Sequence, residues 1–181
     1  TEAYGFLECE VQALQGCEIN LDYPSVGATE NAMLAAVMAK GITKIRNAAK
    51  EPEIVDLQNF LNKMGAEIKG AGSSEITIEG VKKLNSVEHK IMPDRIVAGT
   101  LLVAGAITKG EIVVNNVISE HIKPIISKLR ECGCFIYEED RRLKLKAPQN
   151  LKPIEMIKTL AYPGFPTDMQ AQCMALMTIT P

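Results

Sequence analysis

Asp168 is the side chain whose type and setting best suit proton transfer. It follows Phe165, Pro166 and Thr167, and the residues after it are apolar at helical spacing over 169–177. Thr167 can cap that helix, which would leave the Asp168 carboxylate free to face a cleft. A carboxylate in such a place can accept a proton from a hydroxyl group if its pKa suits the task. Capping of the helix by Asp168 itself is the simpler alternative.

Two further helices are predicted to begin after short polar segments. One follows Ser25, Val26 and Gly27, and the other follows Asp94 and Arg95. A helix N-terminus exposes unpaired N–H groups and a partial positive charge, so it favours anions. Several such ends brought together would suit a ligand with two phosphate groups or with carboxylates. Capping alone remains the simpler explanation of each segment.

The chain repeats one structural plan, in which a helix is followed by a strand, a second helix and a hairpin. The first copy is predicted to have helices at 28–39 and 53–64, a strand at 42–45 and a hairpin at 67–78. The second has helices at 96–109 and 121–132, a strand at 112–114 and a hairpin at 135–145. A third copy begins with the helix at 169–177, and strands at 5–10 and 17–21 finish an earlier one.

Glycines are predicted to close these helices, at positions 41, 65, 110 and 133. The period of about 70 residues is that of a repeated supersecondary module and is too long for an ankyrin or tetratricopeptide repeat. The expected fold class is therefore α/β (α+β). The alternative is a plain α+β protein in which the order of the elements recurs by chance.

The composition excludes several functional classes. Of 181 residues, 20 are basic and 22 acidic, so the net charge of -2 gives no attraction to nucleic acid. The sequence has no apolar run of about 20 residues that could cross a membrane and no secretory signal. The five cysteines and the methionines at 169, 174 and 177 are expected in the core, with the thiols reduced in the cytoplasm. Neither cysteine nor histidine spacing predicts a metal site.

Four segments carry a specific resemblance that covers essentially the whole chain in unbroken order: Ser25–Asn31, Asn47–Asp56, Met92–Ile96 and Phe165–Gln172. They resemble the enolpyruvyl transferase family, and within it the UDP-N-acetylglucosamine 1-carboxyvinyltransferases. The resemblance implies an inside-out α/β barrel of two lobes, each built from three modules with the helices inside. It places residues 1–92 in the later part of one lobe and residues 93–181 at the beginning of the other, so we expect an internal piece of a longer protein. Helices apolar on almost every side fit this fold, because they would be buried.

The resemblance also implies a reaction. The family members in question transfer the enolpyruvyl group of phosphoenolpyruvate to the 3-hydroxyl of UDP-N-acetylglucosamine and release phosphate. This is the first committed step of peptidoglycan synthesis, and it serves cell wall biogenesis, cell shape and cell division. No cofactor is expected. The implied substrates are these two small molecules, without nucleic acid or membrane.

By the same resemblance, Asp168 matches the aspartate that contacts the 3-hydroxyl and is proposed as its base. Ser25, Val26 and Gly27 match positions that bind the UDP group. Further residues match cleft-lining positions: Tyr23, Glu51, Glu53, Asp94, Arg95 and Thr167. Some relatives carry lysine where this chain has Tyr23. Acidic residues at 51 and 53 also complement the dipole of the following helix, which needs no ligand to explain it.

The catalytic cysteine loop and the groups that hold phosphoenolpyruvate are not matched by any part of this sequence. We therefore expect the chain to be inactive by itself and to self-associate through its exposed apolar helices. Two alternatives remain at this point. One is a non-catalytic module of the same fold that binds a nucleotide or sugar, and the other is a sister transferase with another acceptor, such as shikimate 3-phosphate.

Overall fold

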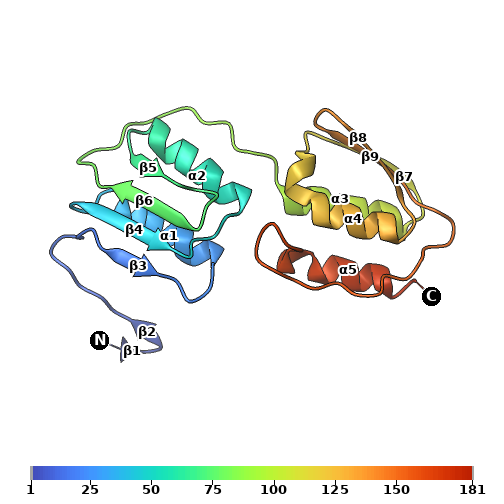
Figure 1. Cartoon of the computed structure of the whole chain (residues 1–181), viewed down its shortest axis with the longest axis horizontal. Helices are drawn as coiled ribbons and strands as arrows, with labels where there is room; N and C mark the ends of the chain where they lie inside the picture. Colours follow the sequence, from blue (N-terminus) through green and yellow to red (C-terminus); the bar gives the residue numbers. More distant parts are fainter. Residues whose placement is uncertain (1, 181) are drawn as a thin grey trace. The chain divides into compact units, whose positions relative to one another are not determined.

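The computed structural model describes residues 2–180, with side chains from Tyr4 onward. The chain forms two compact units that divide between Lys90 and Ile91 (Figure 1). Within the described residues, no helix is long and apolar enough to cross a membrane.

The first unit is a four-stranded sheet with two helices. A short hairpin, β1 (Glu2–Ala3) and β2 (Phe6–Leu7), comes before it. The unit then runs through β3 (Glu18–Asn20), α1 (Val26–Ala36), β4 (Ile42–Arg46), α2 (Pro52–Lys63), β5 (Glu67–Lys69) and β6 (Glu75–Glu79). The strand order is β3-β4-β6-β5, with β3 parallel to β4 and the other pairs antiparallel.

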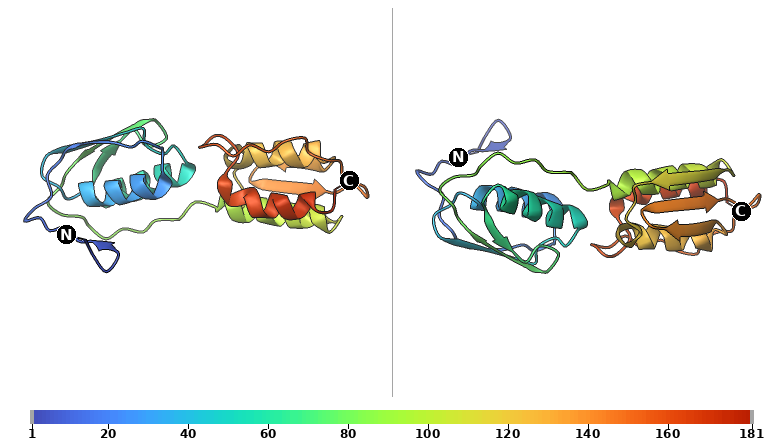
Figure 2. Two further views of the ribbon diagram at one scale, coloured as in Figure 1. Left: turned by 90° about the horizontal axis from the view of Figure 1, so that it is seen from below. Right: turned by 90° about the horizontal axis from the view of Figure 1, so that it is seen from above.

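The second unit has a three-stranded sheet with two helices on one face, and a third helix packs against one of these two (Figures 1 and 2). Its elements are α3 (Arg95–Ile107), β7 (Glu111–Asn115), the 3-10 turn η1 (Ser119–Ile122), α4 (Lys123–Glu131), β8 (Phe135–Glu139), β9 (Arg142–Lys146), the 3-10 turn η2 (Thr167–Met169) and α5 (Gln170–Met177). The antiparallel order is β7-β9-β8. Helix α3 contacts α4, α5, β7 and β9.

The predicted repeat is confirmed by the topology. Along the chain, α1, β4, α2, β5 and β6 correspond in order to α3, β7, α4, β8 and β9. Within the sheets, the order β4-β6-β5 matches the order β7-β9-β8. Apolar and polar residues alternate along the strands, as expected for a sheet with one buried face. In β9, Leu143 and Leu145 are buried and Lys144 between them is exposed. On that outer face Lys144 forms an ion pair with Glu111 of β7, at 2.6 Å.

Two of the four predicted glycine closures hold in detail. Gly65 and Gly133 adopt the left-handed conformation directly after the caps of α2 and α4. After α3, Lys109 takes that conformation in place of Gly110, with a φ of 53°. Helix α1 ends at Ala36, well before Gly41, because the chain leaves the helix early to enter β4.

Several residues that were expected in the core are exposed in this chain. Leu34 is exposed on α1, which is therefore not buried all round, and Met38 is exposed in the turn that follows the helix. Met174 of α5 is also exposed, and so are Cys9, in the segment after β2, and Cys17, directly before β3. The expectation was correct for Cys132, Cys134 and Cys173. Burial raises the pKa of Cys132 and of Cys134 to about 11, so both thiols are protonated at neutral pH.

Two adjacent leucines of α3 provide a test of this core. Leu102 is 0% exposed and Leu101 is 43% exposed. We expect Leu102→Ala to lower the free energy of unfolding of the second unit by about 2–5 kcal/mol, because it removes buried apolar contacts and leaves a cavity. Leu101→Ala, the same change one residue earlier, should cost much less. Urea unfolding of both variants measures the difference, and equal losses would contradict the assigned packing.

Candidate functional site

The first candidate region lies at the carboxyl ends of the parallel strands β3 and β4. The Leu21 amide donates to the Arg46 carbonyl at 3.1 Å, and the Asn47 side chain donates to the Leu21 carbonyl at 2.8 Å. The chain leaves the two strands here and enters α1 and α2. Ligands of open α/β sheets bind at this kind of edge.

Thr29 joins the two loops at this edge. Its fully buried hydroxyl donates to the Ser25 carbonyl at 2.8 Å and accepts from the Ala49 amide at 3.0 Å. Ser25 precedes α1 and Ala49 lies shortly before α2, so one side chain holds the approaches to both helices. Thr29 lies within the recognised segment Ser25–Asn31, but the sequence did not predict its role, because its partner lies 20 residues away.

Ser25 is the N-cap of α1. Its hydroxyl oxygen accepts from the Ala28 amide at 3.3 Å, so the capping explanation is correct for this residue. Val26 and Gly27 form the first turn, where backbone amides have no partner within the helix. A side chain added at Gly27 would meet no atom within 4 Å, which leaves this part of the helix open. Tyr23 is exposed on the loop before it.

Acidic side chains accompany these helix ends. Glu51 is buried at the N-cap position of α2 and makes no side-chain cap, and Glu53 lies in the first turn. Glu30 of α1 joins them. Its pKa is raised, mainly by burial and also by the negative charge of Glu53. Glu30 was missed as a site residue, although it lies within the recognised segment Ser25–Asn31.

The second candidate region lies at the N-terminus of α3. The Asp94 carboxylate accepts from the amides of Ile96 at 2.7 Å and Val97 at 3.0 Å, so Asp94 is a helix cap. Arg95, the first residue of α3, is only 8% exposed. Its guanidinium carbon lies 5.7 Å from the centre of the Tyr162 ring, which is the geometry of a cation–π contact.

Asp168 lies in the middle of η2, directly before α5. The expectation that Thr167 caps this helix is wrong. Thr167 is itself the first residue of the 3-10 turn, Pro166 holds the N-cap position, and no side-chain cap forms. Asp168 is exposed, and within residues 2–180 its carboxylate has no hydrogen bond or ion pair. It is therefore not a cap and is accessible to a ligand.

Met169 fixes η2 against α3. It is fully buried, and its sulfur and terminal carbon would lie 3.0 and 3.1 Å from a side chain added at Gly99. The glycine thus leaves a notch that the methionine fills together with Ile125, whose terminal carbon would lie 2.9 Å from the added side chain. Because Arg95 and Gly99 are four residues apart on α3, they share a face of that helix. Asp168 and Arg95 consequently belong to the same end of the second unit.

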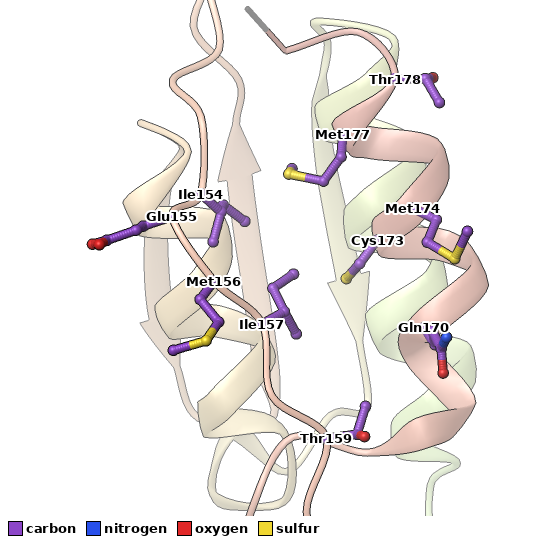
Figure 3. Close-up of a pocket in the computed structure, with 10 residues that line it drawn as sticks. All are labelled: Ile154, Glu155, Met156, Ile157, Thr159, Gln170, Cys173, Met174, Met177 and Thr178. Atoms are coloured by element: carbon purple, nitrogen blue, oxygen red, sulfur yellow. The ribbon is translucent and has the colours of Figure 1, made fainter.

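A groove of about 610 Å³ also opens in this unit (Figure 3). Cys173 and Met177 of α5 face the extended segment that contains Ile154 and Ile157. The lining is mainly apolar and includes none of the predicted site residues. Among the described residues, no cluster of three or more His, Cys, Asp or Glu side chains could hold a metal ion.

The predicted site residues thus fall into two groups. Tyr23, Ser25, Val26, Gly27, Glu51 and Glu53 belong to the first unit, and Asp94, Arg95, Thr167 and Asp168 to the second. The first group surrounds two helix N-termini. The second combines an accessible carboxylate with a buried cation.

Comparisons with known proteins agree on one family. A family model described as EPSP synthase (3-phosphoshikimate 1-carboxyvinyltransferase) matches residues 1–180. The chain is 58% identical over 179 residues to UDP-N-acetylglucosamine 1-carboxyvinyltransferase 1 of Caldanaerobacter subterraneus subsp. tengcongensis, which covers 99% of this chain and 43% of that protein. It is 60% identical over 168 residues to UDP-N-acetylglucosamine 1-carboxyvinyltransferase of Finegoldia magna, covering 92% and 40%. The chain therefore spans less than half the length of these curated relatives.

A solved structure is similar as well. The enolpyruvyl transferase NikO from Streptomyces tendae superposes with a TM-score of 0.81 at 22% identity, covering 94% of this chain and 43% of that one. This likeness shows the fold, an α/β architecture of the enolpyruvyl transferase type.

The Thr29 bridge gives a test of how the first region is held. We expect Thr29→Val to lower the free energy of unfolding of the first unit by about 1–3 kcal/mol, because it leaves the Ala49 amide without its acceptor. Thr29→Ser keeps the hydroxyl and should lose less. Urea unfolding compares the two, and a valine variant as stable as the serine variant would show that the bridge contributes nothing.

Proposed function

Because the chain belongs to the EPSP synthase family of carboxyvinyl transferases, we propose that it forms part of an enzyme that acts on phosphoenolpyruvate and UDP-N-acetylglucosamine. The enzyme transfers the enolpyruvyl group to the 3-hydroxyl of the sugar and releases phosphate, which begins peptidoglycan synthesis. One observation carries this choice of acceptor: relatives at 53–60% identity along nearly the whole chain bear the name UDP-N-acetylglucosamine 1-carboxyvinyltransferase.

Asp168 is the proposed base. The attacking hydroxyl must lose its proton as its oxygen bonds to the enolpyruvyl carbon, and a carboxylate within hydrogen-bonding reach can take that proton. The exposure of Asp168 and its lack of a partner within the described residues support this role. Thr167, Asp94 and Arg95 would line the same part of the cleft.

Ser25, Val26 and Gly27 are the proposed binding site for the UDP group. Free amides in the first turn of α1 suit a phosphate oxygen. The neighbouring carboxylates of Glu30, Glu51 and Glu53 would repel phosphate, so their suitable partners are hydroxyl groups of the ligand. Tyr23 adds an exposed aromatic surface beside the loop.

We infer that residues 1–92 belong to the later part of one lobe and residues 93–181 to the beginning of another. The division of the chain into compact units between Lys90 and Ile91 supports this. The catalytic cysteine loop of the family has no counterpart in this sequence, so the chain by itself should not turn over.

A hybrid enzyme tests the function. Residues 1–181 would replace the matching segment of the Caldanaerobacter relative, which is 58% identical. We expect phosphate release from phosphoenolpyruvate that depends on UDP-N-acetylglucosamine. Asp168→Ala should lower kcat by about 10²- to 10⁴-fold, since a general base is lost. Asp140→Ala is the control, because Asp140 is an exposed aspartate in the β8–β9 turn.

Three results would count against the proposal. Turnover that survives in the Asp168→Ala hybrid would remove its catalytic role. An equal loss in the Asp140→Ala hybrid would show that the effect is unspecific. Phosphate release that depends on shikimate 3-phosphate instead of the nucleotide sugar would assign the sister activity.

The isolated chain should self-associate. Large apolar side chains are exposed on three helices and in the turn after α1, namely Leu34, Val97, Leu101 and Met174 on the helices and Met38 in the turn. Light scattering at increasing protein concentration should show a rising average mass. A monodisperse monomer over the whole range would contradict this prediction.

A further inference from the structure

We propose that Thr100 and Gln172 are positioning residues for Asp168: together they clamp the start of α5, and with it the turn η2, at one place on α3. The inference rests on the proposed role of Asp168 as a base. Thr100 and Gln172 are 72 residues apart in sequence and join the two helices directly.

The clamp is a short chain of hydrogen bonds. The Gln172 side-chain amide donates to the Thr100 hydroxyl oxygen at 3.0 Å. That hydroxyl in turn donates to the Ile96 carbonyl one turn earlier in α3, at 2.8 Å. Because the hydroxyl proton is used within α3, its oxygen is left oriented to accept from Gln172. The bond therefore has a fixed direction as well as a fixed length.

The same hydroxyl also contacts the residue next to Asp168. The Thr100 oxygen lies 3.9 Å from the sulfur of Met169. Met169 fills the notch at Gly99, directly before Thr100 in α3. Asp168 is thus held on its C-terminal side by a packed methionine and, one helical turn later, by the Gln172 bond. On its N-terminal side the Met169 amide donates to the Pro166 carbonyl at 3.2 Å, which closes the turn.

Gln172 has a feature that lowers the stability of the folded unit. Its side-chain oxygen is buried and, within the described residues, has no hydrogen-bond partner. A buried acceptor without a partner costs stability, and an apolar side chain of similar size would avoid the cost. The amide is useful here only for the bond that it donates to Thr100, and that bond fixes the position of α5 on α3.

Position matters for a base. Proton transfer requires the carboxylate to lie within hydrogen-bonding reach of the hydroxyl, and small displacements lower turnover strongly. The Asp168 side chain has no partner of its own among residues 2–180, so its place is set by the backbone of η2. That backbone is set by Met169 and by the clamp.

The hybrid enzyme provides the first test. Thr100→Val and Gln172→Leu each remove the bond between the helices while they keep the size of the side chain. We expect kcat to fall by about 10- to 100-fold, with a much smaller change in KM for either substrate. Thr100→Ser keeps the hydroxyl and should restore turnover. Thr108→Val is the matched control, because Thr108, the C-cap of α3, also donates to the carbonyl four residues earlier, that of Ala104 at 2.9 Å, and has no contact with Gln172.

Hydrogen exchange of the 181-residue chain provides the second test, and it does not depend on activity. In Thr100→Val and Gln172→Leu, the amides of Met169 and Gln170 should exchange about 2- to 10-fold faster. The amides of α4 should not change, and the melting temperature of Gln172→Leu should not fall, because the buried oxygen is removed with the bond. A purely structural role would instead lower the melting temperature and speed exchange throughout the unit.

The possible results separate the two proposals. Unchanged exchange at Met169 and Gln170 in both variants overturns the clamp. Faster exchange with normal kcat overturns its positioning role. An inactive wild-type hybrid refutes the proposed function, and with it the purpose of the clamp, while the exchange measurement still reports whether the clamp exists.

Discussion

The close approach of α3 to its neighbours is the constraint on which the second unit depends. Two glycines make it possible. A side chain at Gly99 would lie 2.9 Å from Ile125 and 3.0 Å from Met169, and one at Gly105 would lie 2.6 Å from Ile112. The first glycine admits α4 and η2, and the second admits the sheet. Protein interiors are close-packed and transmit small displacements. The position of η2, which carries Asp168, therefore depends on how α3 packs against all of its neighbours.

The helix N-termini show how structural and chemical roles divide. Ser25 and Asp94 both cap their helices through hydrogen bonds to backbone amides. Asp168 stands in a similar place in the third module and does not cap. The entry to the first helix of a module therefore carries a capping side chain in two modules, and in the third it carries an accessible carboxylate within a 3-10 turn. A repeated fold can vary function in this way, by changing the local structure at one of its equivalent helix entries.

Much of the fold could be predicted from the sequence, because local patterns determine it. Alternation in β9 and helical spacing in α2 and α4 gave strands and helices close to those observed, and the glycines after α2 and α4 marked their ends. The errors have physical causes. The apolar residues of α1 and of the turn after it indicate a buried helix, but Leu34 and Met38 are each more than half exposed. Thr167 has the right type for a cap, but the chain forms a 3-10 turn before α5 begins.

The candidate site was only partly predictable. Ser25 and Asp168 were predicted as site residues from recognisable segments. Thr29 and Gln172 lie in the same segments, but their roles, like that of Thr100, depend on partners 20 to 72 residues away. No periodicity in the sequence reports such a pair. Glu30 lies in a recognised segment, but its raised pKa could not be predicted. The shift comes from burial and from the charge of Glu53 on another helix.

The buried hydroxyl of Thr29 has a consequence for local unfolding. It donates to the Ser25 carbonyl before α1 and accepts from the Ala49 amide before α2, so the segment before α2 cannot move away from the start of α1 without breaking its bond to Thr29. We expect the two segments to open together for this reason. A ligand that binds either one should then damp the motion of both.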